Sequence, residues 1–472
     1  MKTLITRISF VLFLMTIVFN IDAQLVLRDI ISDNMVLQQR SNVAIWGKDN
    51  PGTEIVISSG WDEETETFTN ETGFWLTRLK TPEAGGPYSI TIKGSNEISL
   101  KNVMIGEVWI CSGQSNMEMP LKGYRNQPVY GGNKAILSAA NENIRFFTVK
   151  KNARLEPVDE ISGQWAESNP ATAAEFSAVG YFFGQLINET LNVPVGLIGS
   201  HWGGSKVQAW IDEPTLLEYG NTDIPDEIFE RKQHTPTVLF NGMINPIIPY
   251  GIKGAIWYQG ESNVNEPEVY QKLFPAMVDN WRELWDLGDF PFYYVQIAPY
   301  RYWGRDAALF REVQSEVMEN IENSGMVVTL DVGDCKSIHP PKKKEIGVRL
   351  AYWALGDTYH IEGIGYKGPA YSDMEIQGDT LIALQFEHAP MGLHAFGNQL
   401  KSFTIAGKDK VFYPANASII RDKADQYKSK VLVWSEEVPS PVAVRYAWEN
   451  CPKGGLYNTY KIPASSFRTD DW

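Results

Sequence analysis

The sequence has few cysteines, no basic run and only one long apolar stretch, and each shortage excludes a class of protein. Three cysteines among 472 residues cannot form a disulfide framework or a metal-binding cluster, and at least one is unpaired within the chain. We expect Cys111 and Cys335 to be buried free thiols. The net charge of −15 and the lack of a basic run argue against nucleic acid and anionic membranes as partners.

The one long apolar stretch lies at the N-terminus and has the pattern of a secretory signal peptide. Lys2 and Arg7 precede the apolar residues 8–19, and Ala23 offers a small residue before a cleavage site. The apolar core is too short to span a membrane comfortably. We therefore expect residues 1–23 to be removed and the mature protein to be secreted or periplasmic, with no stable membrane association.

The pattern of the remaining chain predicts three regions. Residues 24–102 contain short strands separated by turns, which is typical of a small β-sandwich. In residues 103–363, apolar runs alternate with amphipathic helices, which is typical of an α/β fold with a parallel sheet and helices on both faces. Strand patterns return in residues 364–472, where we expect a second β-rich unit packed on the α/β region.

The middle region alternates strands and helices with clear apolar periods. Strands are expected at residues 103–111, 193–199, 252–258, 290–297 and 326–332. Helices are expected at residues 174–191, 267–285, 306–321 and 344–355.

Four of the expected strands end in polar or glycine-rich loops. These loops are Ser112–Asn116, Gly199–Ser205, Gln259–Asn263 and Gly333–Pro340. Ligands bind beyond the carboxyl ends of parallel strands, so we expect the four loops to form one site. Together they contain a serine, glycine N–H donors, amide side chains and a histidine, which are the groups that nucleophilic ester hydrolysis needs.

The loops resemble the sequence blocks of the SGNH (GDSL-like) hydrolases, and the longer context is similar to the sialate O-acetylesterase branch. The pair Gly113-Gln114-Ser115-Asn116-Met117 and Gln259-Gly260-Glu261-Ser262 is specific, and the similarity extends to Ser32–Gln38 and Pro463–Asp470. The resemblance implies an SGNH-like α/β fold and a carbohydrate O-acetylesterase that needs no metal or organic cofactor. The expected substrate is an O-acetylated sialic acid, and acetylated plant hemicellulose or its oligosaccharides are the alternative.

The resemblance also implies roles for particular residues. Ser115 is the expected nucleophile and His339 the expected general base, which argues against the alternative of a carbohydrate-binding protein without activity. The oxyanion hole is expected to use the backbone N–H of Ser115, an N–H of the loop at Gly204, and an amide side chain. Gln259 and Asn263 compete for the last role, and Gln259 is preferred because it lies nearer the end of its strand.

The acidic partner of His339 departs from the family pattern. SGNH enzymes commonly carry an aspartate three residues before the histidine, where this chain has Lys336. We expect Asp334 to complete a catalytic triad. Asp331, behind it in the strand, and a backbone carbonyl are the alternatives, and the carbonyl would leave a Ser–His dyad.

Four further residues are expected to contact the substrate. Arg301 and Arg305 follow a strand end and are candidates for binding a substrate carboxylate in a bidentate manner. Trp202 and Glu261 lie within the loops themselves and complete the predicted substrate-binding set.

Overall fold

Strand β8 (Glu97–Gly113) joins two parts of the molecule. Its first half pairs with β7 (Gly85–Lys93) in an N-terminal β-rich unit, and its second half lies in the middle of a central sheet. The expected boundary between residues 102 and 103 therefore falls inside one continuous strand.

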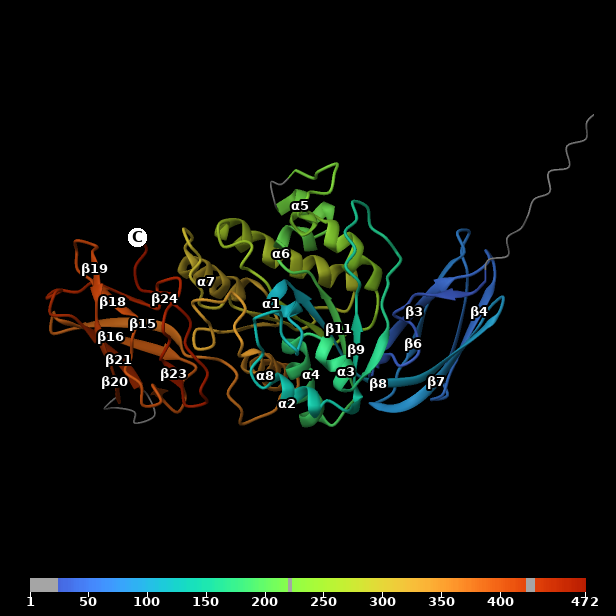
Figure 1. Cartoon of the computed structure of the whole chain (residues 1–472), viewed down its shortest axis with the longest axis horizontal. Coiled ribbons are helices and arrows are strands. Elements are labelled where there is room, and N and C mark those ends of the chain that lie inside the picture. The colour runs from blue at the N-terminus through green and yellow to red at the C-terminus, as the bar shows by residue number, and fades with distance from the viewer. Residues whose placement is uncertain (1–23, 220–222, 422–428) are drawn as a thin grey trace, which may run out of the picture.

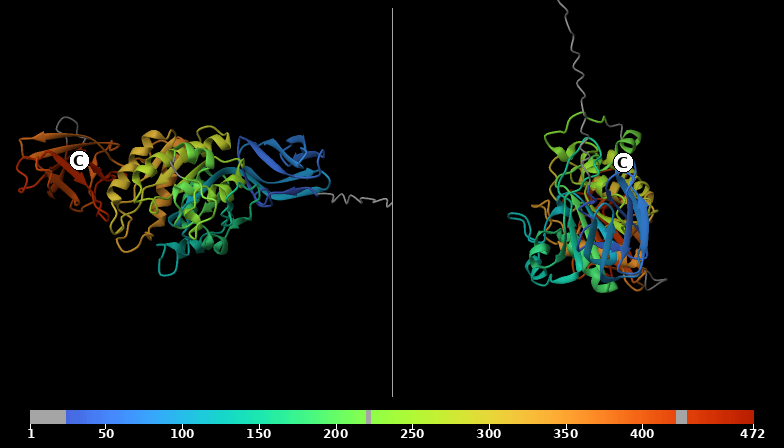
Figure 2. Two further views of the ribbon diagram at one scale, coloured as in Figure 1. Left: turned by 90° about the horizontal axis from the view of Figure 1, so that it is seen from above. Right: turned by 90° about the vertical axis from the view of Figure 1, so that its right-hand side faces the viewer.

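The computed structural model describes residues 24–219, 223–421 and 429–472. The expected signal peptide, residues 1–23, lies outside the described residues. Figure 1 shows the N-terminal unit, a central α/β unit and a C-terminal β-rich unit in a row, and Figure 2 shows the same row from above.

Two sheets make up the N-terminal unit. One contains β1, β3 and β6, and the other contains β5, β4, β7 and the first half of β8, with β2 beside β8. Ile45 and Trp75 of the first sheet and Ile57 and Ile92 of the second are buried in one core. The remaining strands of this unit are β1 Val26–Leu27, β2 Val36–Gln38, β3 Asn42–Lys48, β4 Glu54–Ser59, β5 Glu64–Phe68 and β6 Phe74–Lys80.

The central sheet has the strand order β10-β9-β11-β8-β12-β13-β14. Every neighbouring pair is parallel except β10 and β9, which are antiparallel. The carboxyl ends of the parallel strands therefore meet at one edge. The strands beside β8 are β9 Asn141–Thr148, β10 Trp165–Ser168, β11 Val195–His201, β12 Gly254–Tyr258, β13 Phe292–Val295 and β14 Ser324–Val327.

Helices cover both faces of this sheet, so β8 is apolar on both of its sides. Trp109 and Cys111 pack in a cluster with α4 and α8, whereas Val108 and Ile110 belong to the cluster that contains α6 and α7. No helix among the described residues is long and apolar enough to cross a membrane. The α-helices are α1 Ser115–Glu118, α2 Gly132–Leu137, α3 Pro170–Glu175, α4 Ala178–Leu191, α5 Glu213–Tyr219, α6 Pro267–Trp285, α7 Ala307–Glu316 and α8 Lys343–Trp353. Shorter helical turns are η1 Val207–Trp210, η2 Lys232–His234, η3 Phe240–Ile244, η4 Asn245–Ile247, η5 Val317–Asn320 and η6 Ala354–Thr358.

Two expected elements differ from the structure. The helix expected at residues 174–191 is broken, because Ser177 leaves the helical conformation and its side chain caps α4 by accepting the N–H of Gly180. The strand expected at residues 326–332 ends at Val327. Beyond it the chain turns, and the Thr329 hydroxyl donates to carbonyl oxygens of the neighbouring segment.

The C-terminal unit is β-rich, and a buried arginine fixes it to the central unit. Arg311 of α7 is fully buried, and its guanidinium donates to the carbonyl oxygens of Ala447 and Glu449 at 3.1 and 2.6 Å. The unit contains two four-stranded sheets, β15-β16-β21-β20 and β19-β18-β22-β24, and the pair β17-β23. Its strands are β15 Ala370–Gln377, β16 Leu381–Glu387, β17 Leu393–His394, β18 Phe403–Ala406, β19 Phe412–Pro414, β20 Asn416–Arg421, β21 Ser429–Trp434, β22 Ala443–Tyr446, β23 Tyr457–Asn458 and β24 Phe467–Arg468. The predicted α/β class with β-rich units at both ends is confirmed.

Candidate active site

A sharp turn at the end of β8 presents Ser115. Gly113 has a φ of +130°, and a Cβ atom there would lie 2.3 Å from the carbonyl oxygen of Tyr258, so the turn requires glycine. The N–H of Gln114 donates to the same carbonyl at 2.9 Å. Ser115 is then the first residue of α1, which places its half-buried side chain at the carboxyl edge of the sheet.

His339 reaches Ser115 from the loop between β14 and α8. Its Nε2 atom lies 2.7 Å from the Ser115 Oγ atom, although the two residues are 224 positions apart. The Tyr124 ring packs edge-on against the imidazole, with 5.4 Å between the ring centroids. The structure therefore brings the expected nucleophile and base into hydrogen-bond contact.

The other ring nitrogen of His339 contacts an amide, not a carboxylate. The Oε1 atom of Gln127, in the segment between α1 and α2, lies 2.5 Å from Nδ1 and accepts its hydrogen. This contact fixes the tautomer, because Nδ1 carries the hydrogen and Nε2 is free to accept from the serine. Gln127 is outside the four loops and belongs to no motif, so the sequence contained no signal that could have identified it.

The expectation that Asp334 orients His339 needs correction. The Asp334 carboxylate accepts the backbone N–H of Lys336 at 2.9 Å, within its own turn. Asp331, the alternative, forms a bidentate salt bridge with Arg349, with N–O distances of 2.8 and 2.6 Å. Both carboxylates are occupied locally, and Gln127 holds the position at Nδ1.

His339 is in its neutral form at neutral pH. Burial, and to a smaller extent the charge of Lys343, lower the pKa of its imidazole to about 4 against the opposing effect of the Glu118 carboxylate. A neutral imidazole with its free lone pair toward Ser115 is the form that a general base requires.

The backbone donors expected near the nucleophile are present. Gly203 lies directly against Ser115, since a Cβ atom on it would be 3.3 Å from the serine Cβ. Its own N–H donates to the Glu118 carboxylate. In the described part of the chain, no acceptor lies within hydrogen-bond distance of the backbone N–H of Ser115 or of Gly204.

Both amide side chains expected as oxyanion donors are occupied elsewhere. The Gln259 Nε2 atom donates to the Ser205 carbonyl at 2.9 Å and to Asn263 Oδ1 at 2.8 Å. Asn263 Nδ2 donates in turn to Gln208 and Glu266 at 3.0 and 3.3 Å. The two amides therefore hold the loops together in a buried network, which corrects the expectation for both residues.

Gln114, directly before the serine, offers a different amide. Its Oε1 atom accepts the backbone N–H groups of Gly260 and Ser262 at 3.3 and 3.4 Å, which fixes the side chain. Among the described residues its Nε2 atom forms no hydrogen bond, so its N–H groups are free to donate.

Comparison with known proteins identifies the family. Residues 105–355, more than half of the chain, match the family described as carbohydrate esterase, sialic acid-specific acetylesterase. The chain belongs to this carbohydrate esterase family.

Full-length relatives agree with this identification. Human and mouse sialate O-acetylesterases are 27% and 25% identical to the chain, and the alignments cover 89% and 93% of it and 87% and 93% of those proteins. The crystal structure of a carbohydrate acetylesterase from Xanthomonas citri superposes with a TM-score of 0.86 at 34% identity, covering 95% of this chain and 100% of that one. The protein is an esterase hydrolase with the activity of a carbohydrate O-acetylesterase.

The four residues that were expected to contact the substrate differ in their exposure to solvent. Glu261 is only 2% exposed and accepts from Asn116 beneath the nucleophile, so it does not face a substrate. Trp202 is half-buried beside Gly203, and its ring lies near the Lys151 ammonium. Arg301 and Arg305 are exposed, and among the described residues their guanidinium groups form no hydrogen bond or ion pair.

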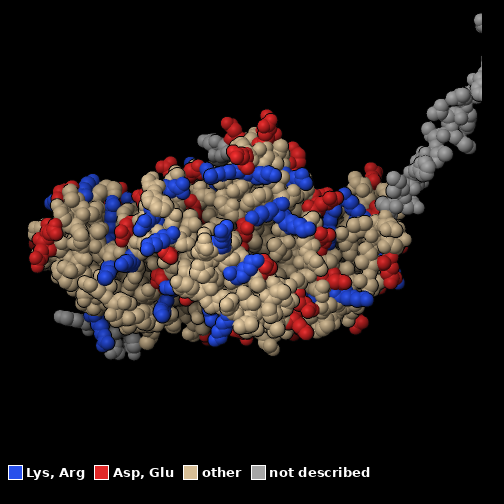
Figure 3. Space-filling model, viewed as in Figure 1, with Lys and Arg blue, Asp and Glu red and all other residues tan. Residues whose placement is uncertain are grey.

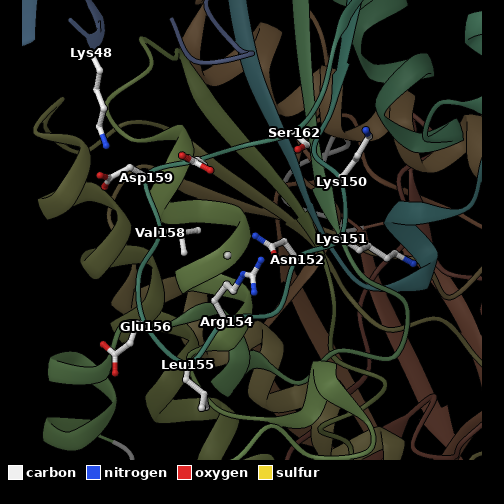
Figure 4. Close-up of a pocket in the computed structure, with 12 residues that line it drawn as sticks. Lys48, Lys150, Lys151, Asn152, Arg154, Leu155, Glu156, Val158, Asp159 and Ser162 are labelled. Atoms are coloured by element: carbon white, nitrogen blue, oxygen red, sulfur yellow. The ribbon is translucent and has the colours of Figure 1, made fainter. Parts of the chain in front are cut away.

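A cavity of about 640 Å³ is lined mostly by residues between positions 150 and 162, and neither Ser115 nor His339 belongs to its wall. Lys151 in its wall points away from the other lining side chains and pairs with Glu118 of α1 at 2.6 Å, and its ammonium lies 5.6 Å from the centre of the Trp202 ring (Figure 4). The wall also contains Lys48, Arg154, Glu156 and Asp159 among its charged residues. Charges of both signs therefore line this cavity.

A disulfide bond ties the histidine loop of the esterase to the C-terminal unit. Cys335, four residues before His339, is bonded to Cys451. The expectation of a free thiol at Cys335 is therefore wrong, because the C-terminal unit brings Cys451 within a Cα–Cα distance of 5.6 Å. Cys111 is a buried free thiol, as expected. In the described part of the chain, no group of three or more His, Cys, Asp and Glu residues is arranged to hold a metal ion.

Proposed function

We propose that the protein removes acetyl groups from O-acetylated sialic acids by a serine acyl-enzyme mechanism. The observation that carries this proposal is the 2.7 Å contact between Ser115 Oγ and His339 Nε2 at the carboxyl edge of the sheet. The full-length similarity to mammalian sialate O-acetylesterases supports the choice of substrate.

In the first half of the reaction, Ser115 Oγ attacks the acetyl carbonyl carbon while His339 Nε2 takes the serine proton. The tetrahedral intermediate collapses, the imidazolium gives its proton to the departing sugar oxygen, and an acetyl-serine ester remains. In the second half, His339 takes a proton from water as the water oxygen attacks the ester carbon. The bond between that carbon and Ser115 Oγ then breaks, the imidazolium returns its proton to Oγ, and acetate leaves. Gln127 keeps the imidazole in the required tautomer throughout.

The negative oxygen of each tetrahedral intermediate is held by N–H donors. We assign this role to the backbone N–H groups of Ser115 and Gly204 and to the side-chain Nε2 of Gln114, which donate no hydrogen bond among the described residues. Removing one such donor typically raises the barrier by about 2.7–4 kcal/mol.

An anionic sugar fits the charge around the site. On the face drawn in Figure 3, Lys and Arg side chains gather over the central unit, on the side where Figure 1 shows α1, although the whole chain is acidic. Arg301 and Arg305, with unpaired guanidinium groups, are the proposed partners of the substrate carboxylate.

We further propose that the esterase acts outside the cytoplasm, as a secreted or periplasmic protein. The N-terminal sequence supports export. The disulfide bond between Cys335 and Cys451 supports it independently, because such bonds persist in oxidising compartments.

The test is the release of acetate from O-acetylated sialic acid, acetylated xylan and p-nitrophenyl acetate. We expect the wild type to act on all acetyl esters that reach Ser115 and to prefer sialic acid. Ser115→Ala and His339→Ala should each lower kcat by about 10⁴–10⁶-fold with unchanged circular dichroism. More than a tenth of the wild-type rate in either variant would contradict the mechanism. If the wild type released acetate from xylan but not from sialic acid, only the proposed substrate would be contradicted.

A further inference from the structure

Beneath the serine and histidine lies a fully buried set of charged and amide groups. Lys343, the first residue of α8, has no exposed surface, and its Nζ atom donates to Asn116 Oδ1 at 2.5 Å. Asn116 Nδ2 donates to the carboxylate of Glu261 and, at 3.0 Å, to the carbonyl oxygen of Ile338. Asn116 is also fully buried, and Glu261 is 2% exposed.

The two charges determine how the Asn116 amide is oriented. An ammonium only donates hydrogen bonds and a carboxylate only accepts them, so Oδ1 faces Lys343 and Nδ2 faces Glu261. A flipped amide would place two donors together at Lys343 and two acceptors together at Glu261. Of the three contacts, removing both charges would leave only that with the Ile338 carbonyl to favour the observed orientation.

The oriented amide joins the two loops that carry the reacting groups. Asn116 directly follows Ser115, and Ile338 directly precedes His339. The second hydrogen of Nδ2 is donated to the Ile338 carbonyl, so one amide links the backbone beside the nucleophile to the backbone beside the base. The distance between Ser115 Oγ and His339 Nε2 therefore depends on this amide.

We propose that Lys343 is a positioning residue of the esterase: together with Glu261 it orients the Asn116 amide, and the amide holds the His339 loop in register with Ser115. This inference rests on the proposed roles of Ser115 and His339. A lysine buried in this way is costly to retain for packing alone, because an ion removed from water is destabilising unless it is paired and hydrogen-bonded.

Lys343 also acts on His339 through its charge. The groups facing the ammonium are the Glu261 carboxylate, the Tyr258 ring, whose centroid is 5.3 Å from Nζ, and the His339 imidazole. Burial lowers the pKa of Lys343 to about 7, against the opposing effect of Glu261. The ammonium lowers the pKa of His339, so its removal should raise that pKa toward the ordinary value of 6.5.

The test compares Lys343→Met with Lys344→Met, which removes the neighbouring exposed lysine. A displacement of about 1 Å at a reacting group costs about 10²-fold in rate, so we expect Lys343→Met to lower kcat for p-nitrophenyl acetate by about 10- to 100-fold. KM should stay within about twofold, and the acidic limb of the kcat profile should move to higher pH. Lys344→Met should match the wild type in all three quantities.

A second variant covers the case in which Lys343→Met does not fold. Glu261→Gln keeps the shape and one acceptor oxygen but removes the negative charge, and we expect kcat to fall by at least about tenfold, since hydrogen bonds to charged groups are stronger than neutral ones. The inference would be overturned if the folded variants kept kcat within threefold of the wild type and the pH profile of Lys343→Met had the same acidic limb as the wild type. An inactive wild type, or an active Ser115→Ala variant, would instead overturn the proposed function on which it rests.

Discussion

Replacing Gln127 tests the contact that the structure places where a catalytic acid was expected. In Gln127→Ala, the Nδ1 hydrogen of His339 loses its acceptor and the imidazole is free to adopt the wrong tautomer. The imidazole becomes positively charged when it takes the serine proton, and a hydrogen bond to a charged group is worth about 1.5–3 kcal/mol. At 1.36 kcal/mol per factor of ten, kcat should fall by about 10- to 150-fold.

Gln127→Glu tests the same contact by replacing the neutral acceptor at Nδ1 with a negatively charged one. A carboxylate at this position would favour the imidazolium and raise the pKa of His339 from about 4 toward 6.5. Because the base must be unprotonated, activity is lost as the pH falls through this pKa. We therefore expect Gln127→Glu to lose activity between about pH 6.5 and pH 4, where the wild type stays active, and to retain it at about pH 8.

The assay for both variants is acetate release from p-nitrophenyl acetate across this pH range, with thermal melting to confirm folding. Gln127→Ala within threefold of the wild-type kcat would refute the role of the amide. An acidic limb that stays near pH 4 in Gln127→Glu would show that the residue at position 127 does not reach Nδ1.

Two further predictions concern the histidine loop. Asp334→Asn should keep kcat within about threefold of the wild type, because the Asp334 carboxylate accepts the N–H of Lys336 and does not contact His339. A loss of more than about tenfold in the p-nitrophenyl acetate assay would contradict this prediction. Replacing both Cys335 and Cys451 by serine opens a cross-link spanning 116 residues and should lower the free energy of unfolding by several kcal/mol, about 4.7 for a loop of 100 residues. Urea unfolding measures the difference, and a reductant should destabilise the wild type but not the double variant.

The pair Ser115 and His339 could be predicted because each follows an apolar strand of a parallel sheet. The parallel pairing of β8, β12, β13 and β14 puts the ends of the strands that precede the two loops at one edge of the sheet, whatever their separation in sequence. Gln127 could not be predicted in this way, since its position depends on the path of the segment between α1 and α2. The roles of Gln259 and Asn263 failed for a related reason: their residue types suit an oxyanion hole, but only the structure shows that their N–H groups already have acceptors.

In a Ser-His-Asp triad, one buried carboxylate both orients the histidine and stabilises its positive charge. In this esterase the hydrogen bond to the ring and the nearby negative charge come from different residues. Gln127 orients the ring, and Glu118, which acts on His339 through its charge alone, favours the imidazolium against the opposing charge of Lys343. An amide oxygen does not titrate, so the acceptor at Nδ1 persists at pH values where a carboxylate would be protonated. The hydrogen bond at Nδ1 thus persists in acid, where protonation of the imidazole limits the reaction.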